Sequence, residues 1–310
     1  MSWIKKGRLL EIDGDSDWMH SHAQLPIYYS LDETHARVYF NVRDKEGRSR
    51  PTYAVFDKRT WEKVGINSEK PLLELGEPGS FDDSGIMCSS LVRSGDDLFM
   101  YYIGWNRRVS VPYHVSIGLA TSKDNGKSFE KYSTGPLLDR SPEEPFFNTS
   151  PFVTIDRGVW EMWYASCTGW VKDDKMEPVY NIQYASSMDG VHWKKDKSKP
   201  AIDYKTSGEA LGSPCVIKEN GIYKMYYSYR NILDYRNNKD NSYKLGYAES
   251  IDGNCWERKD EMTGIILSKE GWDSQMICYS YVFKVDGKKW MLYNGNGFGK
   301  SGFGIAEWNE

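Results

Sequence analysis

Apolar and polar positions alternate along most of the chain, and the alternation is richest in aromatic residues. Five aromatic-rich runs share this pattern: residues 37–43, 98–105, 159–170, 222–230 and 289–296. Each follows a shorter alternating run, from which a polar or glycine-containing turn separates it, as at Glu219-Asn220-Gly221. Pairs of runs joined in this way are typical of antiparallel β-hairpins. The pattern therefore predicts five hairpins.

Two further strands are expected in each repeat. Third runs occupy residues 53–57, 116–122, 181–187, 245–250 and 302–308, and fourth runs occupy 60–64, 128–132, 192–196 and 255–259. The first strands, taken at Pro26, Ser90, Pro151, Pro214 and Ser280, are 64, 61, 63 and 66 residues apart. Four strands in a repeat of this length indicate a propeller blade.

The fifth repeat ends without a fourth strand. Residues 3–10 precede the first repeat, and we expect them to supply that strand and close the ring. The sequence thus predicts an all-β fold, a five-bladed β-propeller of four-stranded antiparallel blades in a single domain over residues 1–310. The expected blades span residues 18–66, 80–133, 144–197, 208–260 and 273–308, with the closing strand at 3–10.

The turns between third and fourth strands carry a local motif. Residues 122–129 read S-K-D-N-G-K-S-F, and shortened versions occur at 187–193 (S-M-D-G-V-H-W) and 250–256 (S-I-D-G-N-C-W). This pattern resembles the Asp-box of sialidase-type propellers. The aspartate can accept backbone N–H groups within the turn, while glycine adopts a positive φ. We interpret these turns as folding devices at the blade edge rather than as parts of a site.

Composition excludes several classes of function. The chain has 310 residues with 40 basic and 44 acidic side chains, a net charge of -4 that favours neither nucleic acid nor an anionic membrane as partner. No apolar run approaches the ~20 residues of a membrane span, and no apolar segment indicates a secretory signal. Five cysteines without a C-x-x-C pair indicate buried thiols in a reducing compartment. We therefore expect a cytoplasmic protein.

Candidate catalytic residues lie in the loops that lead into the first strands. Asp83, Glu144 and Asp273 each stand seven residues before the reference position of their repeat, Glu209 stands five before, and the first repeat has His20 and His22 there. If these loops meet at one mouth of the ring, the carboxylates share an acidic pocket. Close carboxylates shift one another's pKa values apart, as an acid and a base require. The alternative is that they are solvated loop residues.

Candidate substrate-binding residues lie near the ends of the second strands, together with His22. They are Trp105, Trp170, Tyr229, Arg230, Asn294 and Asn296. Aromatic planes beside amide and charged groups are typical of carbohydrate sites. The alternative is that the aromatic residues fill the interior and that Arg230 pairs with a neighbouring Asp. Two histidines alone are too few ligands for a metal site, so we expect no metal and no cofactor.

The full length of the chain resembles the five-bladed β-propeller glycoside hydrolases of families 43, 32, 62 and 68. The five repeats, the S-x-D-G-x-x-W turns, the G-x-Y-x-M-Y-Y-S strand at 221–228 and the E-A-L-G-S-P segment at 209–214 carry the resemblance. The last segment is similar to the E-G-P motif of family 43, which implies Glu209 as general acid. These families place a catalytic Asp directly before proline, whereas Leu25, Ser150 and Ser213 occupy those positions here.

Three hypotheses follow. The first is a glycosidase with Glu209 or Glu144 as proton donor and Asp83, Asp273 or His20 as base or charge stabiliser. The second is a non-hydrolytic protein of polysaccharide biosynthesis that binds a sugar or sugar nucleotide. In both, a carbohydrate or glycoconjugate is the expected ligand. The third, a sialidase, ranks last because only Arg230 is placed to bind a substrate carboxylate.

Overall fold

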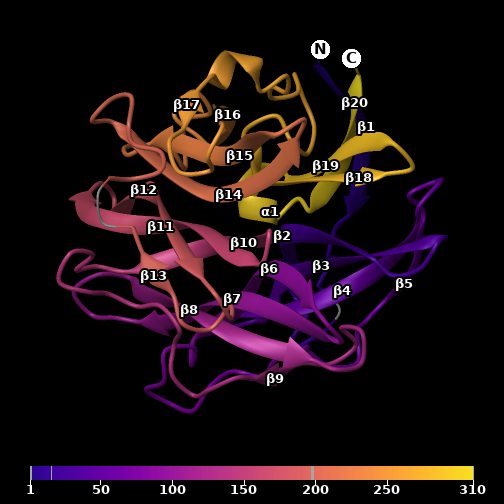
Figure 1. The fold of residues 1–310 in the computed structure, drawn as a ribbon, viewed down its shortest axis with the longest axis horizontal. Coiled ribbons are helices and arrows are strands. Elements are labelled where there is room, and N and C mark those ends of the chain that lie inside the picture. Colours follow the sequence, from indigo (N-terminus) through magenta and orange to yellow (C-terminus); the bar gives the residue numbers. More distant parts are fainter. Residues whose placement is uncertain (1, 15, 197–198, 310) are drawn as a thin grey trace.

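The chain folds into five four-stranded antiparallel sheets arranged around a ring (Figure 1). The computed structural model describes residues 2–14, 16–196 and 199–309; residue 197, the expected end of the third blade, lies outside them. The expected five-bladed β-propeller is confirmed. Four of the sheets run from their first strand at the axis to their fourth at the rim in sequence order.

Blade I comprises β2 (Ser21–Ser30), β3 (His35–Arg43), β4 (Ser49–Asp57) and β5 (Lys63–Ile66). Blade II comprises β6 (Gly85–Ser94), β7 (Asp97–Arg107), β8 (Tyr113–Ser122) and β9 (Glu130–Lys131). Blade III comprises β10 (Asn148–Asp156), β11 (Val159–Lys172), β12 (Met176–Ser187) and β13 (Lys194–Lys195). Blade IV comprises β14 (Glu209–Glu219), β15 (Ile222–Asn231), β16 (Lys244–Ser250) and β17 (Glu257–Arg258).

Blade V joins the two ends of the chain. It contains β18 (Cys278–Val285), β19 (Lys288–Asn294) and β20 (Phe303–Asn309), and β1 (Ser2–Leu10) is its outermost strand. β1 pairs antiparallel with β20, with Trp3 opposite Trp308, so that the termini lie side by side in Figure 1. The expected closure of the ring by the N-terminal strand is therefore confirmed. Short helical turns occur at η1 (Asp260–Met262) and α1 (Asn296–Gly299).

The Asp-box turns connect neighbouring blades. The Asp124 carboxylate accepts the backbone N–H groups of Lys127 and Ser128, each at 3.0 Å. Gly126 has a φ of 77°. Its carbonyl accepts the hydroxyl of Tyr39 from blade I at 2.8 Å. The same bond recurs from Tyr101 to Gly190 and from the Trp163 indole to Gly253. Each box therefore orders its own turn and also binds the preceding blade.

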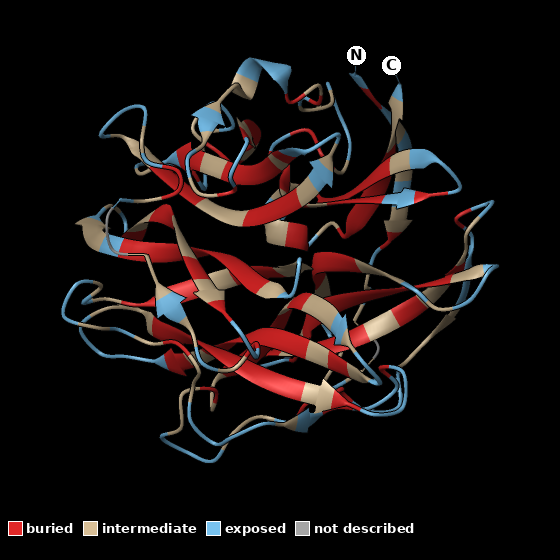
Figure 2. Ribbon diagram, in the orientation of Figure 1, coloured by how far each residue is buried: buried red, intermediate tan, exposed pale blue. Residues whose placement is uncertain are grey.

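The first strands approach one another at the axis. Residues from β2, β6, β10, β14 and β18 line a narrow axial hollow of about 20 Å³. Burial follows the strands, while most loops at the rim are exposed (Figure 2). Four first strands carry a β-bulge at this level, where Leu25, Ser150, Ser213 and Tyr279 have φ values of 49–57°. A positive φ costs a non-glycine residue roughly 1 kcal/mol, and such strain clusters at functional sites.

Candidate functional site: an axial cavity

A cavity of about 350 Å³ opens where the bulged first strands begin, and all five blades contribute to its wall. Leu25, Ser150, Ser213 and Tyr279 line it, so the strained residues face this space. A volume above ~300 Å³ is typical of small-molecule sites. The loops that precede the first strands and those that leave the second strands therefore converge on one mouth.

Aromatic rings form much of the wall. The aromatic lining residues are Trp105, Tyr113, Tyr180, Tyr235, Tyr243, Tyr279 and Phe298. Trp105 and Tyr113 meet edge to face with ring centroids 4.7 Å apart, and the Tyr113 and Tyr180 hydroxyls lie 3.4 Å apart. Phe298 stands in the left-handed turn at α1 with a φ of 59° and packs against Tyr243. The rings come from blades II to V and leave a rigid apolar surface around the cavity.

The charged residues of the wall are all basic. Arg43, Arg107, Lys175 and Arg236 line the cavity, and its described lining contains no aspartate or glutamate. The acidic hollow expected from the sequence is therefore a cationic one. Among the described residues, Glu177 is the one carboxylate within ion-pair distance of any of these four side chains, at 2.7 Å from Arg236 and 4.0 Å from Lys175.

Arg230, a sequence candidate, lies behind the wall and not on it. It is 1% exposed. It donates to the Tyr243 hydroxyl and to the carbonyls of Asn231 and Pro178, at 2.7–3.1 Å. Its guanidinium carbon lies 3.8 Å from the ring centroid of Tyr235. Neighbouring carbonyls and tyrosines thus hold this cation, and its charge adds to the positive character of the cavity from beneath.

The candidate acids Glu144 and Asp273 lie within their own blades. Tyr164 donates to Glu144 at 3.2 Å and Lys195 of the outermost strand pairs with it. Tyr293 donates to Asp273 at 3.0 Å and Lys5 of the outermost strand pairs with it at 2.7 Å. Each of these carboxylates thus forms a triad with a tyrosine of the second strand and a cation of the outermost strand. The same triad recurs at Asp82 in blade II, with Tyr102 and Lys131, and at Asp260 in blade IV, with Tyr227 and Arg258. In these four blades the triad therefore links the second strand of the sheet to its outermost strand.

The other three catalytic candidates are also absent from the cavity lining. Asp83 accepts hydrogen bonds from Ser84 at 2.6 Å and from Asn106 at 3.0 Å; both of these partners line the cavity. Glu209 pairs with Arg258 at 2.8 Å. His20 is exposed, with Nδ1 3.2 Å from the Gly14 carbonyl. The structure therefore does not bring the five candidates together.

Of the candidate substrate-binding residues, Trp105 is the one in the cavity lining. Trp170 packs against Tyr113 and Phe147 behind it, and half-buried Tyr229 packs against the core. Asn294 is buried and bonds to the backbone of Ala23, Leu25 and Gly302. Asn296 accepts the N–H groups of Gln275 and Met276, and the His22 ring lies 2.9 Å from the Ser21 hydroxyl.

Arg43 is the main cavity residue that the sequence analysis missed. It lies opposite Ser21 and Ser49 in blade I, three residues beyond Phe40. Trp105 and Arg230 stand three residues beyond Tyr102 and Tyr227, the counterparts of Phe40, so all three occupy one position of the repeat. Aligning the second strands from their middle would have found Arg43. For Leu25, Ser150 and Ser213, the sequence signal was the proline that follows each of them in its first strand.

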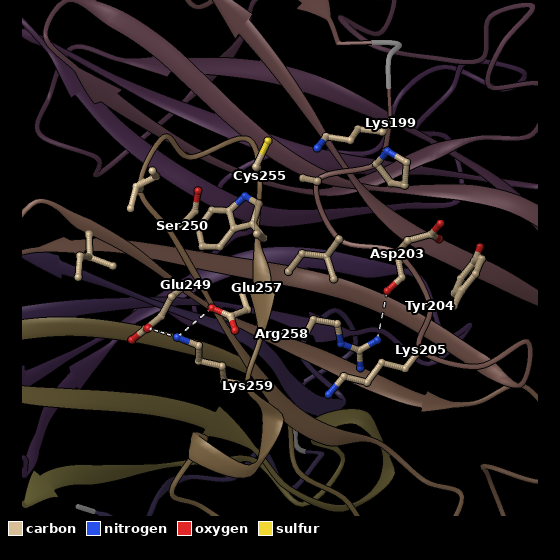
Figure 3. Close-up of a pocket in the computed structure, with 16 residues that line it drawn as sticks. Lys199, Asp203, Tyr204, Lys205, Glu249, Ser250, Cys255, Glu257, Arg258 and Lys259 are labelled. Carbon is tan, nitrogen blue, oxygen red and sulfur yellow. Dashed lines mark hydrogen bonds and ion pairs between the residues drawn. The ribbon is translucent and has the colours of Figure 1, made fainter.

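A second hollow, of about 710 Å³, lies beside the outermost strand of blade IV (Figure 3). Several of its charged groups form ion pairs: Lys259 pairs with Glu249 and Glu257, and Lys205 and Arg258 pair with Asp260. Arg258 also holds Glu209. Within the described ranges, no three His, Cys, Asp or Glu side chains could share a metal ion.

Comparisons with known proteins place the chain in a family. No protein-family model matches it. The Uncharacterized proteins MT1551 and Rv1502 of Mycobacterium tuberculosis, strains CDC 1551 and H37Rv, are each 37% identical over 309 residues, which cover 99% of this chain and 99% of each relative. The chain belongs to their family.

Solved structures share the fold at lower identity. A BT0996 complex with RGII in its name has a TM-score of 0.73 and 18% identity, covering 98% of this chain and 91% of the other. A glycosyl hydrolase from Bacteroides ovatus has a TM-score of 0.68 and 17% identity over 94% and 85% of the two chains. A thermostable family-43 glycoside hydrolase has a TM-score of 0.60 and 19% identity, covering 95% of this chain and 90% of the other. The fold is thus that of five-bladed glycoside hydrolases, as the sequence motifs indicated.

None of the helices that the structure describes is long and apolar enough to cross a membrane.

Proposed function

We propose that this protein binds a carbohydrate or glycoconjugate in the axial cavity without hydrolysing it. The observation that carries the proposal is the wall itself, in which aromatic rings and hydroxyl groups from five blades surround a space whose described lining contains no carboxylate. The fold shared with glycoside hydrolases supports a sugar ligand, and one neighbour's name describes an RGII complex. The finer assignment rests on the chemistry of the cavity.

The cavity offers the two kinds of contact that sugars need. Aromatic rings such as Trp105 and Tyr243 can pack against the apolar face of a pyranose, and hydroxyl groups can bond to its oxygens. The hydroxyls of Ser150 and Ser213 line the cavity and make no hydrogen bond to any residue that the structure describes. They come from blades III and IV, so one ring held between the blades could reach both.

Hydrolysis by the usual route needs two carboxyl groups that flank the glycosidic bond, roughly 5–10 Å apart. Leu25, Ser150 and Ser213 occupy the positions before proline at the cavity, and none of them can exchange a proton as a carboxyl group does. Glu144 and Asp273, two of the acids expected to do so, hold a lysine and a tyrosine in their blades. A glycosidase using these carboxylates is therefore the less supported hypothesis.

A binding and hydrolysis panel tests the proposal. Wild-type protein is titrated calorimetrically with neutral mono- and oligosaccharides and with sugar nucleotides, and is incubated with a panel of aryl glycosides. We expect binding of at least one sugar, loss of that binding in Trp105→Ala and Tyr243→Ala, and no release of the aryl group. Tyr132→Ala is the matched control, because Tyr132 is 53% exposed and lies outside the cavity lining.

Two outcomes would overturn it. Cleavage of an aryl glycoside that Glu209→Gln or Glu144→Gln abolishes, in variants that remain folded by circular dichroism, would establish the glycosidase instead. Absence of binding across the whole panel, or binding that Trp105→Ala and Tyr243→Ala leave unchanged, would remove the axial cavity as a sugar site.

A further inference from the structure

Arg43 presents an uncompensated positive charge to the axial cavity. Its Nε donates to Oε1 of Gln24 at 3.0 Å, and this is the one hydrogen bond that the Arg43 side chain makes to the residues that the structure describes. Within that same part of the chain, no carboxylate lies within 4.0 Å of its guanidinium. Gln24 is 2% exposed, lines the cavity beside Arg43 and orients the Arg43 side chain through this bond. The two terminal nitrogens are thus left for a ligand.

Other positive groups surround Arg43. Burial lowers the pKa of the Arg43 guanidinium, and the nearby charge of Arg236 lowers it further. Burial also lowers the pKa of His22 to about 3, with added repulsion from Arg43 and Lys300. Neighbouring cations destabilise one another in a partly buried site. With a pKa of about 3, His22 is uncharged at neutral pH, so the positive charges here belong to Arg43 and Arg236, and an anion between them would relieve their repulsion.

The charges around the cavity do not balance. Arg43, Arg107, Lys175 and Arg236 line it, and Glu177 is the one described carboxylate that pairs with any of them. Glu177 also accepts the hydroxyl of Tyr235 at 2.5 Å, so it holds Tyr235 and Arg236 in place at the rim. Four cations against one carboxylate leave a surplus of about three positive charges.

We infer that the ligand carries a phosphate group, bound by Arg43 and Arg236 at the mouth of the cavity while the aromatic wall holds its sugar. This inference rests on the proposed function and names the substrate class, a phosphorylated sugar. A sugar carboxylate would bring one negative charge, whereas a diphosphate brings two or more and matches the surplus better. Guanidinium groups present paired N–H donors that fit phosphate oxygens.

The group could belong to a sugar phosphate or to a sugar nucleotide, and the choice of probes separates these sources. Wild-type protein is titrated calorimetrically at low salt with glucose, glucuronate, glucose 1-phosphate, inorganic pyrophosphate, UDP and UDP-glucose. Tight binding of glucose 1-phosphate indicates a sugar phosphate. Tight binding of UDP-glucose with weak binding of glucose 1-phosphate indicates a sugar nucleotide. Both patterns support the inference, and raising the salt should weaken either.

Arg43→Gln is the decisive variant. We expect it to lower the affinity for the phosphorylated ligand about 10- to 100-fold, as loss of a charge-assisted hydrogen bond does. Its thermal midpoint should stay unchanged or rise, because removing Arg43 relieves repulsion. Arg93→Gln is the matched control, since Arg93 is exposed and bonds to Tyr29 and Asn125, and none of these three residues lines the cavity. Arg43→Lys should restore only part of the affinity because it lacks the planar fork.

The possible failures are distinguishable. If neutral sugars bind as tightly as phosphorylated ones, or Arg43→Gln leaves phosphorylated ligands unaffected, the inference falls while the proposed function stands. If phosphorylated and neutral sugars both fail to bind, the proposed function falls with it. If pyrophosphate binds and no sugar improves on it, the site is a simple anion site and both fall.

Discussion

Lys5 Nζ lies 2.7 Å from Oδ2 of Asp273, across 268 residues of sequence. The lysine stands on β1, the outermost strand of blade V, and the aspartate stands in the loop leading into the same blade. Tyr293 donates to the same carboxylate at 3.0 Å. The side chain of Asp273 is 3% exposed, so this contact buries a charge with its partner. The two ends of the chain are thus joined by an ion pair as well as by the β1–β20 ladder.

Lys5→Met should destabilise the protein strongly. It leaves the buried Asp273 carboxylate without its positive partner, and breaking such a pair costs about 3–5 kcal/mol. Chemical denaturation followed by tryptophan fluorescence measures the change in free energy of unfolding. Lys6→Met is the control: Lys6 pairs with Glu307 on a more exposed surface, where the loss should be under about 1 kcal/mol. Equal losses in the two variants would contradict a special role for Lys5 in closing the ring.

Phe40→Tyr should destabilise blade I. Phe40 occupies the position of Tyr102, Tyr164, Tyr227 and Tyr293, but it packs in an apolar cluster that includes Trp18, Met19 and Ile66. In blade I, Ile66 stands opposite Ala54, and in blade II Lys131 stands opposite Ala120. Ile66 therefore occupies the position of the lysine, and blade I lacks the cation of the triad as well as the tyrosine.

A hydroxyl added at Phe40 would be buried without a partner, at a cost of about 1–3 kcal/mol. Thermal unfolding of the variant and the wild type measures this loss of stability. Tyr102→Phe is the converse change and should cost about 1 kcal/mol, because the Asp82–Lys131 pair remains. A Phe40→Tyr variant as stable as the wild type would show that blade I offers an acceptor.

Glu144→Gln should lower stability while leaving ligand affinity unchanged. The substitution removes the ion pair with Lys195 and weakens the bonds from Tyr164 and Asn148, which we expect to cost about 3 kcal/mol. Glu144 is absent from the cavity lining, so calorimetric Kd values should match those of the wild type. Glu130→Gln, at an exposed position of the outermost strand in blade II, controls for the charge change. A large change in Kd with no change in stability would show that Glu144 contributes to ligand binding and contradict this prediction.

Acid should weaken the contact between blades IV and V through Glu219. Burial by itself raises the pKa of this carboxyl, but hydrogen bonds from Lys224 and Lys284 and the charge of Lys289 outweigh it, and the pKa falls from 4.5 to about 2. A depressed folded-state pKa stabilises the protein above the unfolded value. This contribution is therefore complete above about pH 4.5 and disappears as the pH falls towards 2.

The measurement is the free energy of unfolding against pH. Glu219→Gln should be less stable than the wild type at pH 7 and should lose less stability between pH 4.5 and 2. Glu77→Gln, which alters an exposed carboxylate, should keep the wild-type acid slope. Parallel curves for the wild type and Glu219→Gln would remove Glu219 as a source of acid sensitivity.

The sequence by itself determined the blades. Alternation along a strand, a turn such as Glu219-Asn220-Gly221 and a repeat of 61–66 residues are local properties, and each follows from the side chains that a two-faced sheet must bury. The missing fourth strand of the last repeat likewise identified residues 3–10 as the closing strand. These features do not depend on which distant residue a side chain meets.

Only the tertiary structure decided which partners the charged side chains meet and which of them reach the cavity. Counting residues to a strand placed Glu144 and Asp273 at similar levels, but it could not reveal Lys195 or Lys5, which arrive on the outermost strands and hold those carboxylates within their blades. Arg43 and Arg230 occupy one position of the repeat, yet the loop carrying Tyr235 and Tyr243 covers Arg230 and leaves Arg43 at the cavity. An offset in sequence fixes the strand and its register, whereas the direction of a charged side chain follows the partner that folding brings to it.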